Sequence, residues 1–95
     1  MKISWSPQAK LSYFNILEYL HKEWSNKEIK KFVDRTENTL KIISKNPALF
    51  VRSPKKDIHK GFITKQISLY YKINLEDIIL LTFWNNSQSP EMLRI

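Results

Sequence analysis

Two apolar segments of different period, separated by a short polar turn, constrain the fold of this chain most. Apolar and polar residues alternate between Ile67 and Ile73, which predicts a strand with one buried face. Residues 74–77, Asn-Leu-Glu-Asp, supply turn chemistry. The next residues, Ile78 to Trp84, are almost wholly apolar, as in a strand covered on both faces. Together they predict a β-hairpin that carries a sheet.

Two further strands are expected outside this hairpin. Residues 1–5 place Ile3 and Trp5 on one side and polar residues on the other, which predicts a short first strand. Residues 58–64 resume a strand pattern and contain the single glycine, Gly61, which indicates a bulge or a close backbone approach. Residues 47–57 between the helices and this strand predict a loop, whose Leu49, Phe50 and Val51 we expect to plug an edge of the core.

Two helices are expected in the first half of the chain. Ser6 followed by Pro7 is a helix start, and apolar residues then recur at spacings of three and four to Glu23. The stripe comprises Ala9, Tyr13, Ile16, Leu17, Leu20 and Trp24. Ser25 and Glu28 match a capping box for a second helix that ends near Ser44. So short a connection predicts an antiparallel helical hairpin.

These elements predict an α+β fold in the order strand, helix, helix, strand, strand, strand. The N-terminal helical hairpin should pack on a mainly antiparallel four-stranded sheet. A chain of 95 residues fits one domain, 1–95. The lack of cysteine and the wide separation of the two histidines argue against a metal site or cofactor and suit the cytoplasm. Neither a signal peptide nor a membrane span is expected.

The charge is the more informative part of the composition. Sixteen Lys and Arg against nine Asp and Glu give a net charge of +7. One basic segment is opposed only by Asp57 and contains Arg52, Lys55, Lys56, Lys60, Lys65 and Lys72. Such a segment fits an anionic partner, such as nucleic acid, an acidic protein segment or a lipid surface, and equally a solvated surface.

Several phrases of the sequence together resemble the RelE/ParE superfamily of bacterial type II toxins. They are the opening ISWSPQAK, the segment KGFITKQISLYYKI and the C-terminal IILLTFWNNSQSPEML. The resemblance covers nearly the whole chain. It implies a growth-inhibiting toxin, of the kind linked to plasmid stabilisation, in a hetero-oligomer with a cognate antitoxin. The antitoxin would carry an acidic, amphipathic tail. The basic segment and Trp84, Asn85 and Gln88 are candidate contacts for the antitoxin or for the toxin's target.

The superfamily contains two activities, and the residues must decide between them. RelE-like members cut mRNA on the ribosome without a metal, and ParE-like members are associated with DNA gyrase. RelE-like nucleases often carry an arginine where Ser68 aligns, and relatives often carry one at Ser87. Neither serine transfers protons at neutral pH, and the same holds for Trp84, Asn85 and Gln88. The resemblance therefore favours a ParE-like toxin over a ribosome-dependent endoribonuclease.

Some nuclease chemistry remains open at four residues. His59 is a candidate proton-transfer group, Lys60 and Lys65 can hold phosphate, and Tyr70 is expected on the solvent side of its strand. A surface histidine in a hydrogen bond is the commoner alternative for His59. Trp84 could stack on a nucleotide base, and the commoner alternative is that its ring covers the edge of the core. A non-toxic nucleic-acid-binding domain on the same scaffold is the third hypothesis.

Overall fold

The computed structural model describes residues 1–52, 57–93 and 95. The elements follow the predicted order and end in one 3₁₀ turn. They are β1 (Lys2–Trp5), α1 (Pro7–Glu23), α2 (Asn26–Lys45), β2 (His59–Phe62), β3 (Ile67–Asn74), β4 (Asp77–Asn85) and η1 (Pro90–Met92). Lys55 and Lys56 of the predicted basic segment lie outside the described residues.

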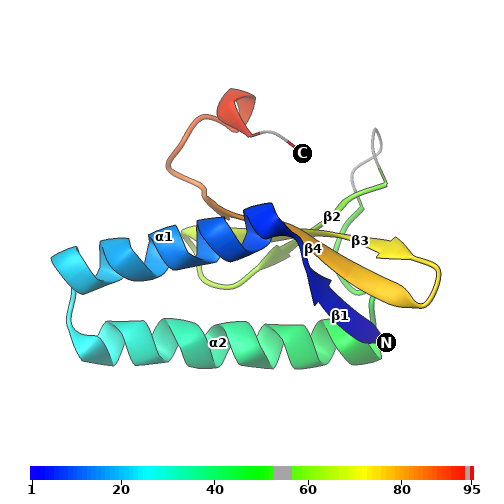
Figure 1. Cartoon of the computed structure of the whole chain (residues 1–95), viewed down its shortest axis with the longest axis horizontal. Coiled ribbons are helices and arrows are strands. Elements are labelled where there is room, and N and C mark those ends of the chain that lie inside the picture. The colour runs from blue at the N-terminus through cyan, green and yellow to red at the C-terminus, as the bar shows by residue number, and fades with distance from the viewer. Residues whose placement is uncertain (53–56, 94) are drawn as a thin grey trace.

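The strands form one sheet in the order β1-β4-β3-β2. The pairs β2–β3 and β3–β4 are antiparallel, whereas β1 lies parallel to β4. The helices α1 and α2 run antiparallel to each other on one side of the sheet, and the chain after β4 turns away from α2 (Figure 1). The predicted α+β fold, with a helical hairpin on a mainly antiparallel sheet, is confirmed.

The start of α1 ties the helix to the sheet. The Ser6 side chain accepts a hydrogen bond from the Ala9 N–H at 3.0 Å and donates one to the Leu81 carbonyl at 3.1 Å. Its backbone N–H also bonds the Leu80 carbonyl at 3.1 Å. Ser6 therefore caps the helix and fixes the direction in which α1 leaves β1.

The start of α2 differs from the expected capping box. Ser25 is the N-cap residue, but its side chain makes no cap hydrogen bond. The Ser25 carbonyl instead accepts a bond from the Glu28 N–H at 3.0 Å. The predicted helix start is right, and the predicted side-chain bond of Ser25 is wrong, because the motif permits the bond without enforcing its rotamer.

The core lies between the helices and the helix-facing side of the sheet. Its buried residues are Ala9, Phe32, Ile43, Ile63, Ile67, Leu69, Tyr71, Ile78, Leu80 and Phe83. Trp5, Tyr13 and Phe83 form an aromatic cluster at its centre, with ring centroids 5.0 to 5.4 Å apart. The helical stripes read from the sequence supply the helix side of this core, and Trp24 alone of the α1 stripe is left largely exposed.

The loop after α2 is held by the sheet. The Tyr71 hydroxyl donates a 2.7 Å hydrogen bond to the Pro47 carbonyl. Phe50 packs against the core, as expected, whereas Leu49 and Val51 stay exposed. A Cβ on Gly61 would lie 3.0 Å from the Phe50 ring. The group that approaches this glycine closely is therefore the Phe50 side chain, and not another segment of backbone. The register irregularity of the sheet lies instead between Tyr70 and Tyr71.

Within the described residues, no helix is long and apolar enough to cross a bilayer.

Candidate functional site: a groove between the helical hairpin and the sheet

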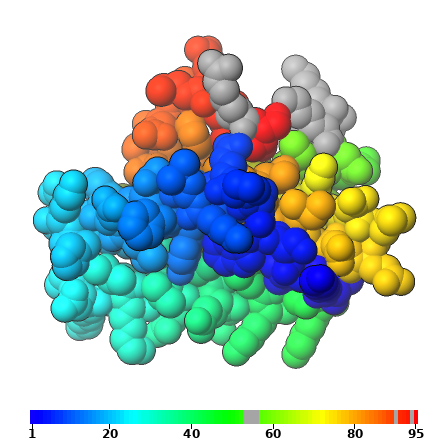
Figure 2. Space-filling view, viewed as in Figure 1, coloured from blue at the N-terminus to red at the C-terminus, as the bar shows by residue number. Residues whose placement is uncertain are grey.

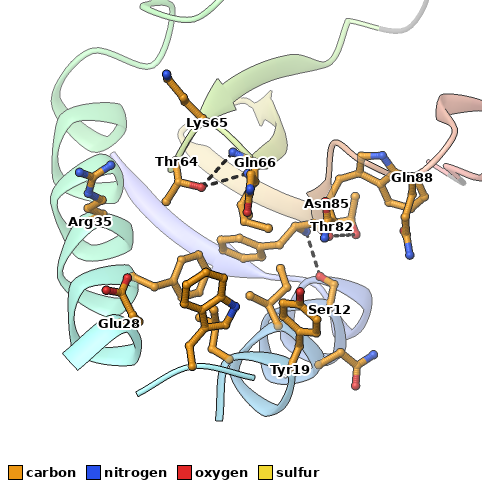
Figure 3. Close-up of a pocket in the computed structure, with 18 of the residues that line it drawn as sticks. Ser12, Tyr19, Glu28, Arg35, Thr64, Lys65, Gln66, Thr82, Asn85 and Gln88 are labelled. Atoms are coloured by element: carbon orange, nitrogen blue, oxygen red, sulfur yellow. Dashed lines mark hydrogen bonds between the residues drawn. The ribbon is translucent and has the colours of Figure 1, made fainter. Parts of the chain in front are cut away.

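A groove of about 630 Å³ opens where the helical hairpin reaches past the sheet (Figure 3). One wall is formed by α1 and α2, and the other by the turn between β2 and β3, the end of β4 and the residues that follow it. The buried side chains of Phe32, Ile67 and Phe83 line its inner part. The groove is thus an unfilled continuation of the core.

The groove exists because β1 is shorter than β4. β1 pairs with β4 only from Asp77 to Leu80, so the edge of β4 beyond Leu80 has no strand partner. Helix α1 runs along this edge, and the Phe83 N–H donates a 2.9 Å hydrogen bond to the Ser12 hydroxyl (Figure 3). A helix satisfies this edge amide without covering the sheet as closely as a strand would.

The groove walls are rich in exposed apolar side chains. Leu11, Tyr19 and Trp24 are 61%, 53% and 55% exposed and all line the groove. Trp84 borders the groove at the end of β4 and is half-buried, and as the cross-strand partner of Ser68 it lies on the open face of the sheet. Large apolar side chains gathered on one concave surface are typical of sites that bind a protein segment.

The groove mouth is positively charged. Lys31 and Arg35 extend from successive turns of α2, and Lys65 comes from the β2–β3 turn (Figure 3). Glu28 is the acidic side chain among the lining residues. The described chain forms ion pairs between Lys30 and Asp34 and between Arg52 and Asp57, and none with these three cations. They are therefore available to carboxylates of a ligand.

Asn86 fixes the width of the groove at the sheet end. Its backbone N–H bonds the Gln66 carbonyl at 2.7 Å, and its side-chain amide donates to the Lys65 carbonyl at 3.4 Å. Its side-chain oxygen accepts a 2.9 Å bond from the hydroxyl of Ser68, which is fully buried. These bonds join the β2–β3 turn to the segment that carries Trp84.

The structure divides the predicted site residues into separate places. Lys65, Trp84, Asn85 and Gln88 all line the groove. Lys60 and Tyr70 are cross-strand partners on the opposite, open face of the sheet. The Lys60 ammonium lies 5.8 Å from the Tyr70 ring centroid and 5.5 Å from that of Phe62. The exposed Lys72 follows on the same face by the alternation of β3.

His59 does not join Lys60 and Tyr70. It is buried, 7% exposed, on the helix-facing side of β2, where its ring stacks on Tyr71 with centroids 5.1 Å apart. Its Nδ1 lies 2.8 Å from the Phe50 carbonyl. The expectation of a surface histidine is wrong, because the rings of Phe50 and Tyr71 close over that end of the strand.

The described cations of the basic segment do not form one continuous surface. Arg52 forms an exposed ion pair with Asp57 at 2.9 Å. Lys60 and Lys72 occupy the open face, and Lys65 lies in the β2–β3 turn that borders the groove. Cations that lie in one segment of the sequence are therefore divided between the open face of the sheet and the groove.

Several groove residues were not predicted from the sequence. Leu11 and Tyr19 lie off the core stripe of α1, and Lys31 and Arg35 lie on the exposed side of α2. The available signal was the i, i+8 spacing of Leu11 and Tyr19, which places two large apolar side chains on one face outside the core stripe.

Burial changes the titration of two core tyrosines. Desolvation raises the pKa of the Tyr71 phenol above its ordinary value. Desolvation also raises the pKa of the Tyr13 phenol, and the nearby Glu37 carboxylate adds to the effect. Both phenols stay protonated at neutral pH and serve structure. Among residues 1–52, 57–93 and 95, no group of three His, Asp or Glu could hold a metal ion.

Comparison with known proteins identifies the fold. No family model and no curated protein matches the sequence. Among solved structures, the chromosomal ParDE toxin-antitoxin system from P. aeruginosa matches with a TM-score of 0.75 at 14% identity, over 90% of this chain and 95% of that chain. A copper-bound mutant toxin from Helicobacter pylori matches with a TM-score of 0.67 at 14% identity, over 98% and 99%.

A third similar structure is the YoeB dimer from Staphylococcus aureus. It matches with a TM-score of 0.59 at 24% identity, over 86% of this chain and 92% of that chain. The same toxin is also seen in a YoeB-YefM complex. The RelE/ParE-like fold expected from the sequence is therefore confirmed, since the ParDE and YoeB structures share this architecture over most of the chain.

Proposed function

We propose that this chain is the ParE-like toxin of a type II toxin-antitoxin pair, which inhibits growth through DNA gyrase and is neutralised by an antitoxin bound in the groove. The observation that carries the proposal is the groove itself. It leaves Leu11, Tyr19 and Trp24 exposed along its helical wall in a chain with a toxin fold. Burying that apolar surface needs a partner.

The groove supports a partner segment that is both apolar and acidic. Apolar side chains of the segment would pack on Tyr19 and Trp24. Carboxylates of the segment would meet Lys31, Arg35 and Lys65. These are the properties expected of an acidic, amphipathic antitoxin tail. The solved neighbours include a ParDE system and YoeB-YefM complexes, which supports a hetero-oligomer for this chain as well.

Gyrase is favoured over mRNA as the target because the nuclease groups are missing or inaccessible. Cleavage by a 2′-hydroxyl needs a proton acceptor, cations for the developing charge and a donor for the leaving oxygen. Ser68 stands where nuclease relatives often carry arginine, and its buried hydroxyl is bonded to Asn86. His59 faces the core and not the open face on which Lys60 lies. A toxin of this kind acts in the cytoplasm by protein contact.

A ribosome-dependent endoribonuclease is the second candidate, and one observation favours it. Lys60, Phe62 and Tyr70 form a cation and aromatic cluster on the open face, with Lys72 on the same face. Such a surface suits a single-stranded nucleic acid, whose bases stack on rings and whose phosphates pair with ammonium groups. A non-toxic nucleic-acid-binding domain would use the same cluster.

Two assays separate these functions. Induction of the chain in a bacterial host should arrest growth with DNA synthesis falling before protein synthesis, and the purified chain should inhibit supercoiling by gyrase. The double variant Lys60→Ala/Tyr70→Phe should keep this activity. Cleaved transcripts in a translating extract, unimpaired supercoiling and loss of toxicity in the double variant would instead establish the nuclease. A chain that binds oligonucleotides with steep salt dependence and never arrests growth would be the binding domain.

The neighbouring gene is expected to encode a small protein with an acidic tail that restores growth on co-expression.

A matched pair of variants tests whether such an antitoxin binds at the groove mouth. Arg35→Glu reverses a charge at the groove mouth, and Lys41→Glu reverses an exposed charge on the same helix outside the groove. We expect Arg35→Glu to weaken antitoxin binding about tenfold and Lys41→Glu to leave it within about twofold. Equal effects of both variants would exclude the groove mouth as the contact.

A further inference from the structure

The turn between β3 and β4 contains a residue that suits neither its backbone nor its surroundings. Asn74 pairs with Asp77, so Leu75 and Glu76 form a two-residue turn. Leu75 has φ of 56°. Positive φ at the first central position alone is the pattern of a type II′ turn, in which glycine is usual. Asp57 is the other described non-glycine residue with positive φ, and Asp tolerates it far better than a bulky leucine.

Leu75 also lacks contacts that would favour an apolar side chain. It is 91% exposed, the highest value among the large apolar side chains of the described residues. Single exposed leucines are ordinary, but this one combines exposure with a disfavoured backbone angle. Folding of the isolated chain favours glycine or asparagine here on both grounds, so the reason for leucine lies outside the isolated fold.

The turn lies at the opposite end of the sheet from the groove. Ile67 lines the groove and begins β3, and Leu75 follows eight residues later, which corresponds to about 26 Å of extended strand. Figures 1 and 2 show the turn, in yellow, projecting at one end of the molecule, while the α1–α2 connection lies at the other. One short segment cannot occupy both places.

The charges of the two places differ as well. The turn contributes the carboxylates of Glu76 and Asp77, whereas the groove mouth contributes cations. The nearest cations by register are Lys2, opposite Asp77, and Lys72, which is two residues before the turn. Neither forms an ion pair with another residue that the structure describes. A rigid hairpin that presents a leucine beside Glu76 fits an apolar pocket with a basic edge. A partner with that pocket differs from the acidic segment that suits the groove.

We infer that Leu75 is the apolar anchor with which the chain docks into its target protein. The inference rests on the proposed function, in which the target is reached by protein contact. Leu75 enters a pocket on the target, and Glu76 pairs with a cation at the pocket edge. Burial of one leucine side chain corresponds to an affinity change of roughly tenfold to a hundredfold.

The test uses Leu75→Asn and Leu75→Gly, which remove the side chain and accept positive φ. Both variants should unfold at or above the temperature of the unchanged chain, bind purified DNA gyrase roughly tenfold to a hundredfold more weakly and lose growth arrest. Val51→Asn removes another exposed apolar side chain, 81% exposed, and should keep gyrase binding. A gain in stability together with a loss of toxicity cannot come from misfolding.

Three results overturn the inference. If the unchanged chain arrests growth through gyrase and the Leu75 variants match it, the anchor is excluded and the proposed function stands. If the unchanged chain neither arrests growth nor impairs supercoiling, or cleaves mRNA instead, both fail. If the variants keep gyrase binding and change only the sedimentation of the chain, the turn contacts a second copy.

Discussion

Two serines precede the two helices of this chain, and only one of them caps with its side chain. Ser6 accepts from the Ala9 N–H and donates to the Leu81 carbonyl, whereas Ser25 makes no cap hydrogen bond. Loss of an N-cap bond costs about 1 kcal/mol, and loss of the bond to Leu81 about 1 kcal/mol more. Ser6→Ala should therefore lower the free energy of unfolding by about 2 kcal/mol and the melting temperature by roughly 8–16 °C. Ser25→Ala should change it by less than about 0.5 kcal/mol.

Urea denaturation followed by far-UV circular dichroism measures both variants under the same conditions. The two substitutions are chemically identical and both stand at a helix N-cap, so helix propensity cancels between them. If Ser25→Ala destabilises the chain as much as Ser6→Ala, the helix starts are set by propensity and not by the hydrogen bonds seen here. If neither variant loses more than about 0.5 kcal/mol, Ser6 does not anchor α1 to β4 in energetic terms.

Three further predictions concern the sheet and its covering loops. Because burial raises the pKa of the Tyr71 phenol, the unfolded chain loses this proton at lower pH than the folded chain does. The contribution to stability is therefore full below about pH 10 and falls as the pH rises through the folded-state pKa. Urea denaturation midpoints should decrease over this pH range, and Tyr71→Phe should make the decrease smaller. Gly61→Ala places a Cβ 3.0 Å from Phe50 and should cost about 1–3 kcal/mol in a thermal melt; an unchanged midpoint would show that the ring moves freely. Asn86→Ala leaves the buried Ser68 hydroxyl without its acceptor and should cost about 1–3 kcal/mol, with faster amide exchange at Ile67; unchanged exchange would contradict the role of Asn86 in holding the turn.

The secondary structure was readable from the sequence because its periodicities are clean. The alternation from Ile67 onward placed Leu69 and Tyr71 toward the helices, and the structure buries both completely. Ser6 and Pro7 predicted the residue at which α1 starts, and the short connection near Trp24 predicted the antiparallel helical hairpin. These features depend on local chemistry, which neighbouring residues record.

The burial of single polar side chains was not readable in the same way. His59 lies on the helix-facing side of β2, and whether it meets solvent depends on Phe50, nine residues earlier, folding back over that strand. Ser68 lies on the open face yet is fully buried, and its hydroxyl bonds Asn86, which follows the end of β4 eighteen residues later in the chain. Contacts between residues this far apart leave no periodic mark in the sequence.

The groove could not be predicted because it follows from strand register. β1 covers β4 only as far as Leu80, and Ser12 of α1 takes over the edge at Phe83. A shift of two residues in that pairing would put the edge of β4 under a strand and close the groove. The sequence names Trp84 and Lys65 as candidates, but only the register brings both to the border of a groove that Trp24 also lines.

Under the proposed function, the separation of the groove from the β3–β4 turn limits how an antitoxin can neutralise this chain. If the target docks at Leu75, a partner confined to the groove leaves the docking residue uncovered about 26 Å away. Covering that distance takes roughly eight extended residues or about seventeen helical ones. An antitoxin that blocks the target directly must therefore continue along the sheet beyond its groove-binding segment. One that ends at the groove would bind the toxin and leave the turn free to reach its target.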